Sequence, residues 1–200
     1  FLDNDWKNYE YCKKHLLKIK KSLGFKNIDT LYIHNPKFLI NNRSKKLVLN
    51  LSRLKTEGFF KKTGISIYTY DTLYRDLKKF KFDAVQCPLN VFDQRLINKG
   101  HLDKLKKMNI KVHVRSIFLQ GVLLNENMKK KNKLRQFSKQ LNHYFNFIKL
   151  NNIKPLEFCL NYVLNVKKID KFIIGINSKN HLKEIINFKA NKKYNYDLFD

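Results

Sequence analysis

The sequence predicts an α/β fold, in which short strands alternate with helices. Two periodicities support this prediction: apolar residues recur every three or four positions in the longer segments, and short β-branched runs follow them. The two patterns alternate five times along the 200 residues. Strands that are separated by helices pair in parallel through right-handed crossovers. Five such strands fit either an open doubly wound sheet or part of a (β/α)8 barrel.

A third observation favours the barrel. The sequence contains neither GxGxxG nor GxxxxGK[ST] after any expected strand. An open dinucleotide-binding sheet and a P-loop fold would each need one of these phosphate-binding elements. We therefore expect one barrel-type domain over residues 1–200.

The first half of the chain opens on a helix and then alternates. Apolar side chains from Trp6 to Leu23 have the period of an amphipathic helix, and Gly24 is placed to end it. The Asn35-Pro36 pair marks a turn after the first β-rich run. The expected elements are a helix at 5–23, a strand at 28–34, a helix at 44–57, a strand at 64–69, a helix at 71–80 and a strand at 82–86.

The second half contains the longest expected helix. Apolar residues from Leu134 to Ile148 keep spacings of three and four, and a lysine-rich run at 129–133 falls where this helix would begin. Pro155 opens the next helix, because the first helical N–H needs no partner, and Ser178 caps the last. The expected elements are a helix whose last part is residues 101–108, a strand at 110–116, helices at 128–149 and 156–165, a strand at 171–176 and a helix at 178–188.

The net charge of +26 raises the possibility of a nucleic-acid partner, because a strongly basic chain attracts phosphate. However, 36 of the 42 cationic residues are Lys and only 6 are Arg. Arg supplies the bidentate contacts on which nucleic-acid recognition depends. The accompanying excess of Asn and Ile over Ala indicates a compositional bias of the gene. We expect no nucleic-acid partner, and a basic nucleic-acid-binding protein is the third of three hypotheses.

Other compositional features concern location and metals. No apolar run approaches the ~18 to 20 residues that a membrane span needs, so we expect no membrane partner. Cys12, Cys87 and Cys159 are an odd number without CxxC spacing, which favours reduced thiols in a cytoplasmic protein over disulfides or a zinc site. We expect Cys87, Cys159 and His113 to be core residues and no metal to be bound. The oligomeric state is left open.

Polar, uncharged side chains gather at the carboxyl ends of the expected strands, where α/β enzymes hold their ligands. The set contains no paired carboxylates and no His, Asp and Glu cluster, which argues against glycoside hydrolysis and metal chemistry. It suits the binding of an anionic cofactor. Its members are His34, Asn35, Ser66 to Thr69, Gln86, Cys87, Asn90, Ser116, Gln120, Gly121, Gly175, Asn177 and Ser178.

Five segments of the chain resemble the aldo/keto reductases in order and spacing. They are residues 22–35, 64–68, 85–95, 114–124 and 173–182. The resemblance covers essentially the whole chain and implies strands four to eight of a (β/α)8 barrel. The sequence motifs QCPLN…DQR and HVRSIFLQG are most similar to those of a bacterial branch of this family that is associated with surface-polysaccharide sugar pathways.

The resemblance implies that NADPH or NADH reduces an aldehyde or ketone, a small-molecule carbonyl substrate that is sugar-derived in that branch, to an alcohol. His34 aligns with the active-site histidine that hydrogen-bonds the substrate carbonyl oxygen. Ser66 and Gln86 align with residues that hold the nicotinamide carboxamide. Ser116 aligns with a phosphate contact, and Arg115 replaces an aromatic residue that stacks on the nicotinamide.

The end of the chain aligns with the family's adenosine-phosphate site. Gly175, Asn177 and Ser178 fall on its loop and helix N-terminus, where free N–H groups and the helix dipole favour an anion, and Lys179 adds positive charge. Two further residues depart from the family pattern, since Ile67 and Ile185 stand where asparagines are usual.

The family's tyrosine general acid, with its Lys and Asp partners, lies on the first three strands of the barrel. This sequence begins at the helix before the fourth strand. The resemblance therefore implies an N-terminally truncated reductase that is inactive alone. The alternative hypothesis is a catalytically silent barrel kept for cofactor binding or as a scaffold.

Overall fold

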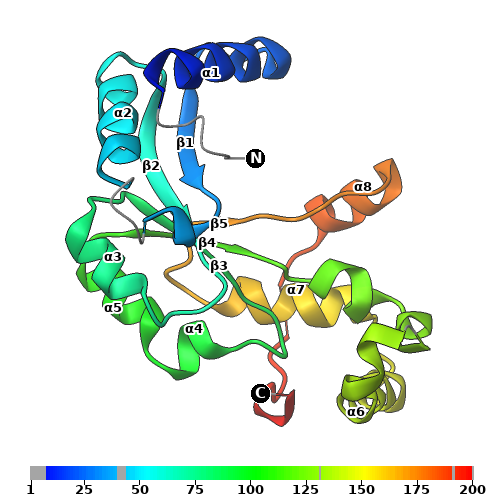
Figure 1. Ribbon diagram of the computed structural model, residues 1–200. Helices are drawn as coiled ribbons and strands as arrows, with labels where there is room; N and C mark the ends of the chain where they lie inside the picture. The colour runs from blue at the N-terminus through cyan, green and yellow to red at the C-terminus, as the bar shows by residue number, and fades with distance from the viewer. Residues whose placement is uncertain (1–7, 40–43, 131, 191, 200) are drawn as a thin grey trace. The chain divides into compact units, whose positions relative to one another are not determined.

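Five parallel strands organise the molecule. They form one sheet in the order β1-β2-β3-β4-β5, and the β1–β2, β2–β3 and β4–β5 pairs are parallel (Figure 1). The predicted α/β class is confirmed. None of the helices in the described part of the chain is long and apolar enough to cross a membrane. The computed structural model describes residues 8–39, 44–130, 132–190 and 192–199.

The chain divides into two compact units. Unit 1 comprises residues 1–86 and 108–111, and unit 2 comprises residues 87–107 and 112–200. Unit 1 contains α1 (Tyr9–Leu23), β1 (Ile28–Ile33), η2 (Pro36–Leu39), α2 (Ser44–Thr56), β2 (Phe60–Ser66), α3 (Leu73–Lys79) and the first three residues of β3 (Ala84–Pro88).

Unit 2 contains the rest of β3 and nearly all of β4. Its helices include several short 3₁₀ turns between the longer α-helices. The elements are α4 (Arg95–Asn98), α5 (His101–Lys107), β4 (Lys111–Arg115), η3 (Leu119–Leu124), η4 (Glu126–Lys130), η5 (Asn132–Phe137), α6 (Ser138–Leu150), α7 (Pro155–Asn165), β5 (Lys171–Phe172), α8 (Lys179–Asn187) and η6 (Asp197–Phe199).

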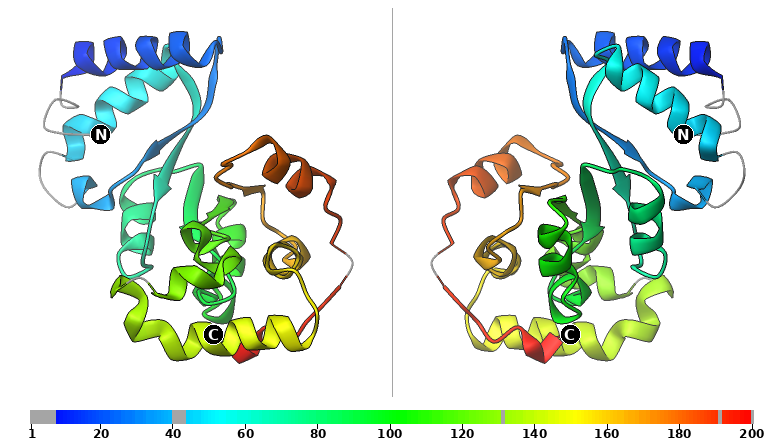
Figure 2. Two further views of the ribbon diagram at one scale, coloured as in Figure 1. Left: turned by 90° about the vertical axis from the view of Figure 1, so that its right-hand side faces the viewer. Right: turned by 90° about the vertical axis from the view of Figure 1, so that its left-hand side faces the viewer.

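In unit 1, α1 confirms the predicted first helix from Tyr9 onward, and the expected residues 5–7 lie outside the described residues. The Asn8 side chain caps α1 by accepting a hydrogen bond from the Tyr11 N–H at 3.2 Å. Gly24 ends it in the left-handed conformation at φ 67°. Cys12 is fully buried on the inner face of α1. Figures 1 and 2 show α1 and α2 beside β1 and β2.

Strand β2 begins earlier than predicted, at Phe60 instead of residue 64, and it ends at Ser66. Lys61 and Lys62 hide the apolar pattern in the sequence. The pairing shows why the strand is longer: Ile28 of β1 is in register with Phe60, whose side chain is only 2 % exposed.

In unit 2, a cluster of aromatic rings forms part of an otherwise mostly aliphatic interior. α7 begins at Pro155, as predicted, and buries nearly its whole circumference. The ring of Phe158 contacts five other rings, and Phe199 of η6 is one of them. Figure 2 shows the C-terminal segment beside α6, where Phe199 contacts His143 and Phe147. Cys87, Cys159 and His113 are buried as expected.

The helix predicted at 128–149 is wrong in its first part. Residues 126–130 and 132–137 form 3₁₀ turns, and the α-helix begins at Ser138. The sequence spacing that includes Leu134 and Phe137 does not reflect burial, since Phe137 is 48 % exposed. The described residues of the lysine-rich run therefore belong to the 3₁₀ turns η4 and η5 instead of opening a long helix, and Lys131 lies outside the described residues.

The strand predicted at 171–176 is shorter than expected. Only Lys171 and Phe172 pair with β4, and the Ile173 N–H still donates to the Val114 carbonyl at 2.8 Å. β4 then ends at Arg115, and Ser116 turns into the left-handed region at φ 61°. The edge of β4 therefore offers no further partner. Helix α8 with its Ser178 cap is confirmed.

Both units have an aspartate at the amino end of a strand that binds a backbone N–H of the neighbouring strand and a lysine. In unit 1, the Asp83 carboxylate accepts from the Thr63 N–H at 2.8 Å and from Lys55 Nζ at 2.6 Å. In unit 2, the Asp170 carboxylate accepts from the Val112 N–H at 2.7 Å and pairs with Lys106. Each aspartate thus joins its own strand to the neighbouring strand and to the helix before that neighbour.

Candidate functional site

All the predicted site residues lie in or after the carboxyl-terminal part of a strand. The two units divide them. Unit 1 contains His34 after β1, Ser66 at the end of β2 and Gln86 in β3; unit 2 contains Arg115 and Ser116 at the end of β4, and Gly175, Asn177, Ser178 and Lys179 after β5.

In unit 1, the structure brings Ser66 and Gln86 together. The two residues are in register on β2 and β3, and the Ile67 N–H donates to the Gln86 carbonyl at 2.8 Å. The fully buried Ser66 hydroxyl donates to Gln86 Oε1 at 3.2 Å. This contact fixes the side-chain amide of Gln86. Among the described residues, the Nε2 group of that amide has no hydrogen-bond acceptor, so it can donate to a carbonyl oxygen of a ligand.

The imidazole of His34 stands apart from that pair. It follows β1 directly and is exposed. Within the described part of the chain it forms no hydrogen bond or ion pair, and none joins it to Ser66 or Gln86. An exposed imidazole in this position is accessible to a substrate oxygen.

In unit 2, the structure brings Arg115 and Ser116 together. Arg115 Nη1 donates to Ser116 Oγ at 3.0 Å. Ser116 itself has φ 61°, and Leu119, Gln120 and Gly121 after it also have positive φ angles. Left-handed backbone at a residue other than glycine costs about 1 kcal/mol or more, and such residues cluster where ligands bind. Successive turns of this kind also present backbone N–H groups to anions.

The start of α8 is open to solvent. Gly175, Asn177, Ser178 and Lys179 are all exposed. The Ser178 hydroxyl accepts from the His181 N–H at 3.1 Å and caps the helix. The first N–H groups of α8 and the Lys179 ammonium make this end of the helix electropositive, which suits a phosphate.

Two buried amides near these residues have roles that the sequence did not predict. Asn90 is 1 % exposed, and its side chain bonds to three backbone groups. Gln94 is 3 % exposed, donates to the Tyr196 carbonyl at 2.7 Å and accepts from the Tyr162 hydroxyl at 3.2 Å. The available sequence signal was two amides within the apolar stretch around Leu89.

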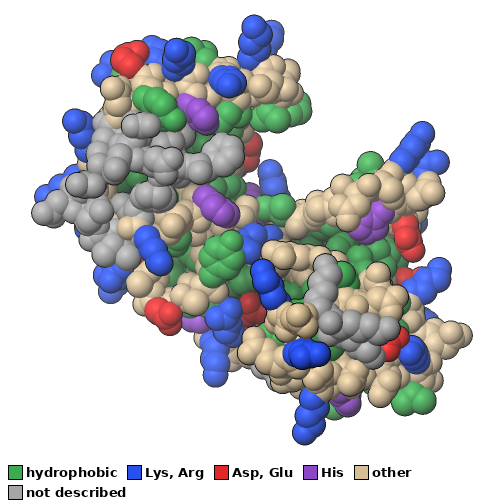
Figure 3. Space-filling model, turned by 45° about the vertical axis from the view of Figure 1, so that its right-hand side comes forward, with side chains coloured by type: hydrophobic (Ala, Val, Ile, Leu, Met, Phe, Trp, Pro, Cys, Tyr) green, Lys and Arg blue, Asp and Glu red, His purple; other side chains and the backbone are tan. Residues whose placement is uncertain are grey.

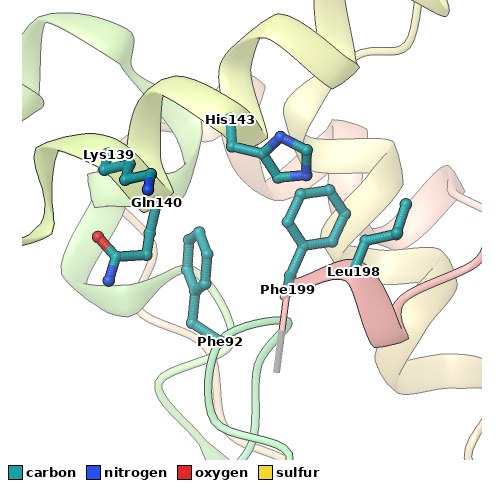
Figure 4. A pocket seen from close by; sticks show the side chains of 6 residues that line it. All are labelled: Phe92, Lys139, Gln140, His143, Leu198 and Phe199. Atoms are coloured by element: carbon teal, nitrogen blue, oxygen red, sulfur yellow. The ribbon is translucent and has the colours of Figure 1, made fainter.

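Unit 2 also contains a cavity of about 350 Å³ that none of the predicted site residues lines (Figure 4). Phe92 and Phe199 form two of its walls, with ring centroids 6.1 Å apart and nearly perpendicular planes. The other lining residues are Lys139, Gln140, His143 and Leu198.

A second cavity, of about 410 Å³, lies on the segment that follows β4. Gln120 lines it together with Val122, and Lys133 of the lysine-rich run lies on the same cavity. A cationic residue therefore lies beside a cavity whose wall includes Gln120, which has a positive φ angle.

Cys12 and Cys159 are not candidates for nucleophilic chemistry. Burial raises the pKa of the Cys12 thiol to about 11 and that of the Cys159 thiol to about 12. Burial also raises the pKa of Tyr144, whose hydroxyl contacts Cys159 Sγ and the Leu123 carbonyl. These groups are neutral at physiological pH and serve packing.

Positive side chains are scattered on the face of the molecule in Figure 3, among hydrophobic and neutral groups. This is the distribution that a general excess of lysine would give. The expectation of no nucleic-acid partner stays a prediction.

Comparison with known proteins identifies the family. The model of the aldo/keto reductase family matches residues 4–198. The chain belongs to the aldo/keto reductase family. The predicted resemblance is thereby confirmed at the level of the family, and no curated protein matches the chain.

Two solved structures share the fold. The apo form of the aldo-keto reductase AKR11C1 from Bacillus halodurans is 16 % identical, with a TM-score of 0.74 over 96 % of this chain and 67 % of that one. The holo form is also 16 % identical, with a TM-score of 0.67 over 100 % of this chain and 64 % of that one. The chain thus spans about two thirds of the length of these structures.

Proposed function

We propose that this chain acts in the reduction of an aldehyde or ketone to an alcohol by hydride transfer from NADPH or NADH. Family membership supports an oxidoreductase. The observation that carries the proposal is the Ser66–Gln86 pair, because it presents a fixed amide donor at the carboxyl end of a parallel strand. That donor fits the carboxamide of a nicotinamide ring.

In unit 1, Ser66 and Gln86 would hold the carboxamide and so select the face of the ring that is presented to the substrate. Orientation of this kind is a large part of what a protein contributes to cofactor chemistry. His34 would donate a hydrogen bond to the substrate oxygen and stabilise the negative charge that develops there. When bound, the nicotinamide supplies the hydride.

In unit 2, the residues fit anionic groups. Ser116 would contact the cofactor's phosphates, with Arg115 beside it. The exposed loop and helix start at Gly175, Asn177 and Ser178 would hold the adenosine phosphate. Lys179 at the first position of α8 favours binding of NADPH over NADH, because its ammonium attracts the additional phosphate of NADPH.

The narrower parts of the proposal rest on the resemblance of the sequence motifs. They are a sugar-derived carbonyl as substrate, a bacterial origin, a cytoplasmic location and correspondence of the five strands to barrel strands four to eight. Inactivity of residues 1–200 alone also stays a prediction, because no residue here is assigned as the proton donor to the alkoxide.

The test is a titration with NADPH that follows nicotinamide fluorescence. Gln86→Glu keeps an oxygen for the Ser66 hydroxyl and removes the amide donor, so it should weaken NADPH binding by about tenfold. The matched control is Gln140→Glu, which makes the same change on the exposed surface of α6.

Equal affinities of the two variants, or no NADPH binding by the unaltered chain, would contradict the proposal. Turnover of an aldehyde with NADPH then separates a reductase from a silent cofactor-binding scaffold.

A further inference from the structure

Asn90 joins two loops of unit 2 at the carboxyl ends of β3 and β4. Its Oδ1 accepts from the Phe92 N–H at 2.9 Å and from the Asp93 N–H at 3.1 Å. Its Nδ2 donates to the Ser116 carbonyl at 3.2 Å. One side chain, 1 % exposed, therefore closes its own turn and reaches across to the end of β4.

The turn that holds Asn90 is itself fixed. The Asn90 and Asp93 backbones exchange two hydrogen bonds, at 3.3 and 3.0 Å. The Asp93 carboxylate binds Arg95 through both oxygens, each at 2.8 Å. The Leu89 N–H donates to the Arg115 carbonyl at 3.1 Å. Asn90 thus projects from a braced loop that is already tied to β4.

The carbonyl that Asn90 binds lies at the point where β4 turns. Ser116 adopts φ 61°, and its carbonyl accepts a second hydrogen bond from the Leu119 N–H at 2.9 Å. Positive φ angles then recur at Leu119, Gln120 and Gly121. A strained segment of this kind persists only where surrounding contacts determine it. The bond from Asn90 is one of those contacts.

We propose that Asn90 is a positioning residue that holds segment 116–121 in the conformation that has positive φ angles at Ser116 and at 119–121, and thereby places Ser116 for the pyrophosphate of the cofactor. This inference rests on the proposed function for the identity of the ligand. Asn90 contacts the segment through the Ser116 carbonyl and acts on the ligand through that contact alone. The positioning itself can be measured without any ligand.

The decisive variant is Asn90→Asp, studied at pH 8. The introduced carboxylate keeps an oxygen for the Phe92 and Asp93 N–H groups, so the turn is retained. It has no hydrogen for the Ser116 carbonyl, and two acceptors then face each other. The matched control is Asn161→Asp, because Asn161 is also 1 % exposed and donates its amide to a backbone carbonyl, that of Glu157 at 2.9 Å.

Two measurements on the whole chain test the inference. The first is amide hydrogen exchange of residues 116–121, which we expect to accelerate by about tenfold in Asn90→Asp and to stay unchanged in Asn161→Asp. The second is affinity. Asn90→Asp should bind NADPH about tenfold more weakly and should bind adenosine 2′-monophosphate, which has neither phosphate of the pyrophosphate, as well as the unaltered chain does.

Each outcome decides something. Unchanged exchange in Asn90→Asp would overturn the inference, and so would equal weakening of both ligands, which indicates a general loss of structure. If the unaltered chain binds no NADPH, the proposed function fails. The exchange data then still decide whether Asn90 holds the segment.

Discussion

The two units have the same hydrogen-bond arrangement at the amino ends of their strands, whereas the carboxyl ends of their strands differ. At the amino ends, Asp83 in unit 1 and Asp170 in unit 2 each bind a neighbouring strand N–H and a lysine. At the carboxyl ends, unit 1 relies on one side-chain pair, Ser66 with Gln86. Unit 2 instead has the left-handed turn at Ser116, whose carbonyl accepts a hydrogen bond from the buried amide of Asn90.

This difference suggests that the amino ends of the strands contribute to stability, whereas the carboxyl ends contribute to ligand binding. The repeated aspartate device satisfies strand N–H groups and would be useful in any parallel sheet. The carboxyl ends differ in chemistry, with a side-chain amide donor in unit 1 and backbone with positive φ angles, which suits anions, in unit 2. Substitutions at the amino ends should therefore change folding, whereas substitutions at the carboxyl ends should change binding.

The largest expected effect on stability is in the interiors of the units. Phe158→Ala removes a fully buried ring that contacts five others in unit 2, and it should lower the free energy of unfolding by about 4 kcal/mol. Leu54→Ala in unit 1 removes a smaller buried side chain and should cost about 3 kcal/mol. Urea unfolding followed by far-UV circular dichroism measures both. A larger cost for Leu54→Ala would refute the view that the aromatic cluster is the stronger core.

The amino ends give the next effect. Asp170→Ala leaves the Val112 N–H and Lys106 without their carboxylate, and Asp83→Ala does the same to the Thr63 N–H and Lys55. We expect losses of about 2 and about 1 kcal/mol. Asp170 is the more costly, because its side chain is 20 % exposed and that of Asp83 is 40 % exposed.

The same urea experiment, with NADPH titrations of both variants, tests the separation. Stability should fall while the affinity of the remaining folded protein is kept. A loss of affinity without a loss of stability would break the distinction between the two ends of the strands.

The smallest effect is on the pH dependence of stability. Burial holds the folded-state pKa of Cys12 at about 11 and that of Cys159 at about 12, above the ordinary value of 9.0. The unfolded chain therefore loses these protons first as pH rises. Each thiol's contribution is complete below pH 9 and declines up to about pH 11 for Cys12 in unit 1 and about pH 12 for Cys159 in unit 2.

The measurement compares unfolding free energies of Cys12→Ala and Cys159→Ala with the unaltered chain across this range. The comparison cancels the titration of lysines and tyrosines. Each variant should lose stability less steeply above pH 9 than the unaltered chain. Parallel curves would show that the thiols do not contribute.

Single-segment patterns predicted most of the fold. α1, α7 and α8 follow from apolar spacing, a glycine end, a proline start and a serine cap, all local signals. The errors arose where the outcome depends on a distant segment. β5 stops where it does because Ser116, more than fifty residues earlier, leaves the extended conformation. Spacing alone also could not show that Phe137 lacks a buried partner.

For the candidate site, the sequence predicted where its residues lie on the strands, and their roles stay predictions. Strand ends indicated the positions of His34, Ser66, Gln86 and Ser116, because parallel strands collect ligand-binding residues there. The sequence could not predict the bond from Ser66 to Gln86, nor the role of Asn90, since both depend on which strands are neighbours and on their register.

The central claim is that the carboxyl ends of these strands bind a nicotinamide dinucleotide. The most direct measurement is a fluorescence titration of the unaltered chain with NADPH, followed by displacement with NADP⁺. We expect saturable enhancement of nicotinamide emission that NADP⁺ reverses. Emission identical to that of free NADPH at every protein concentration would contradict it.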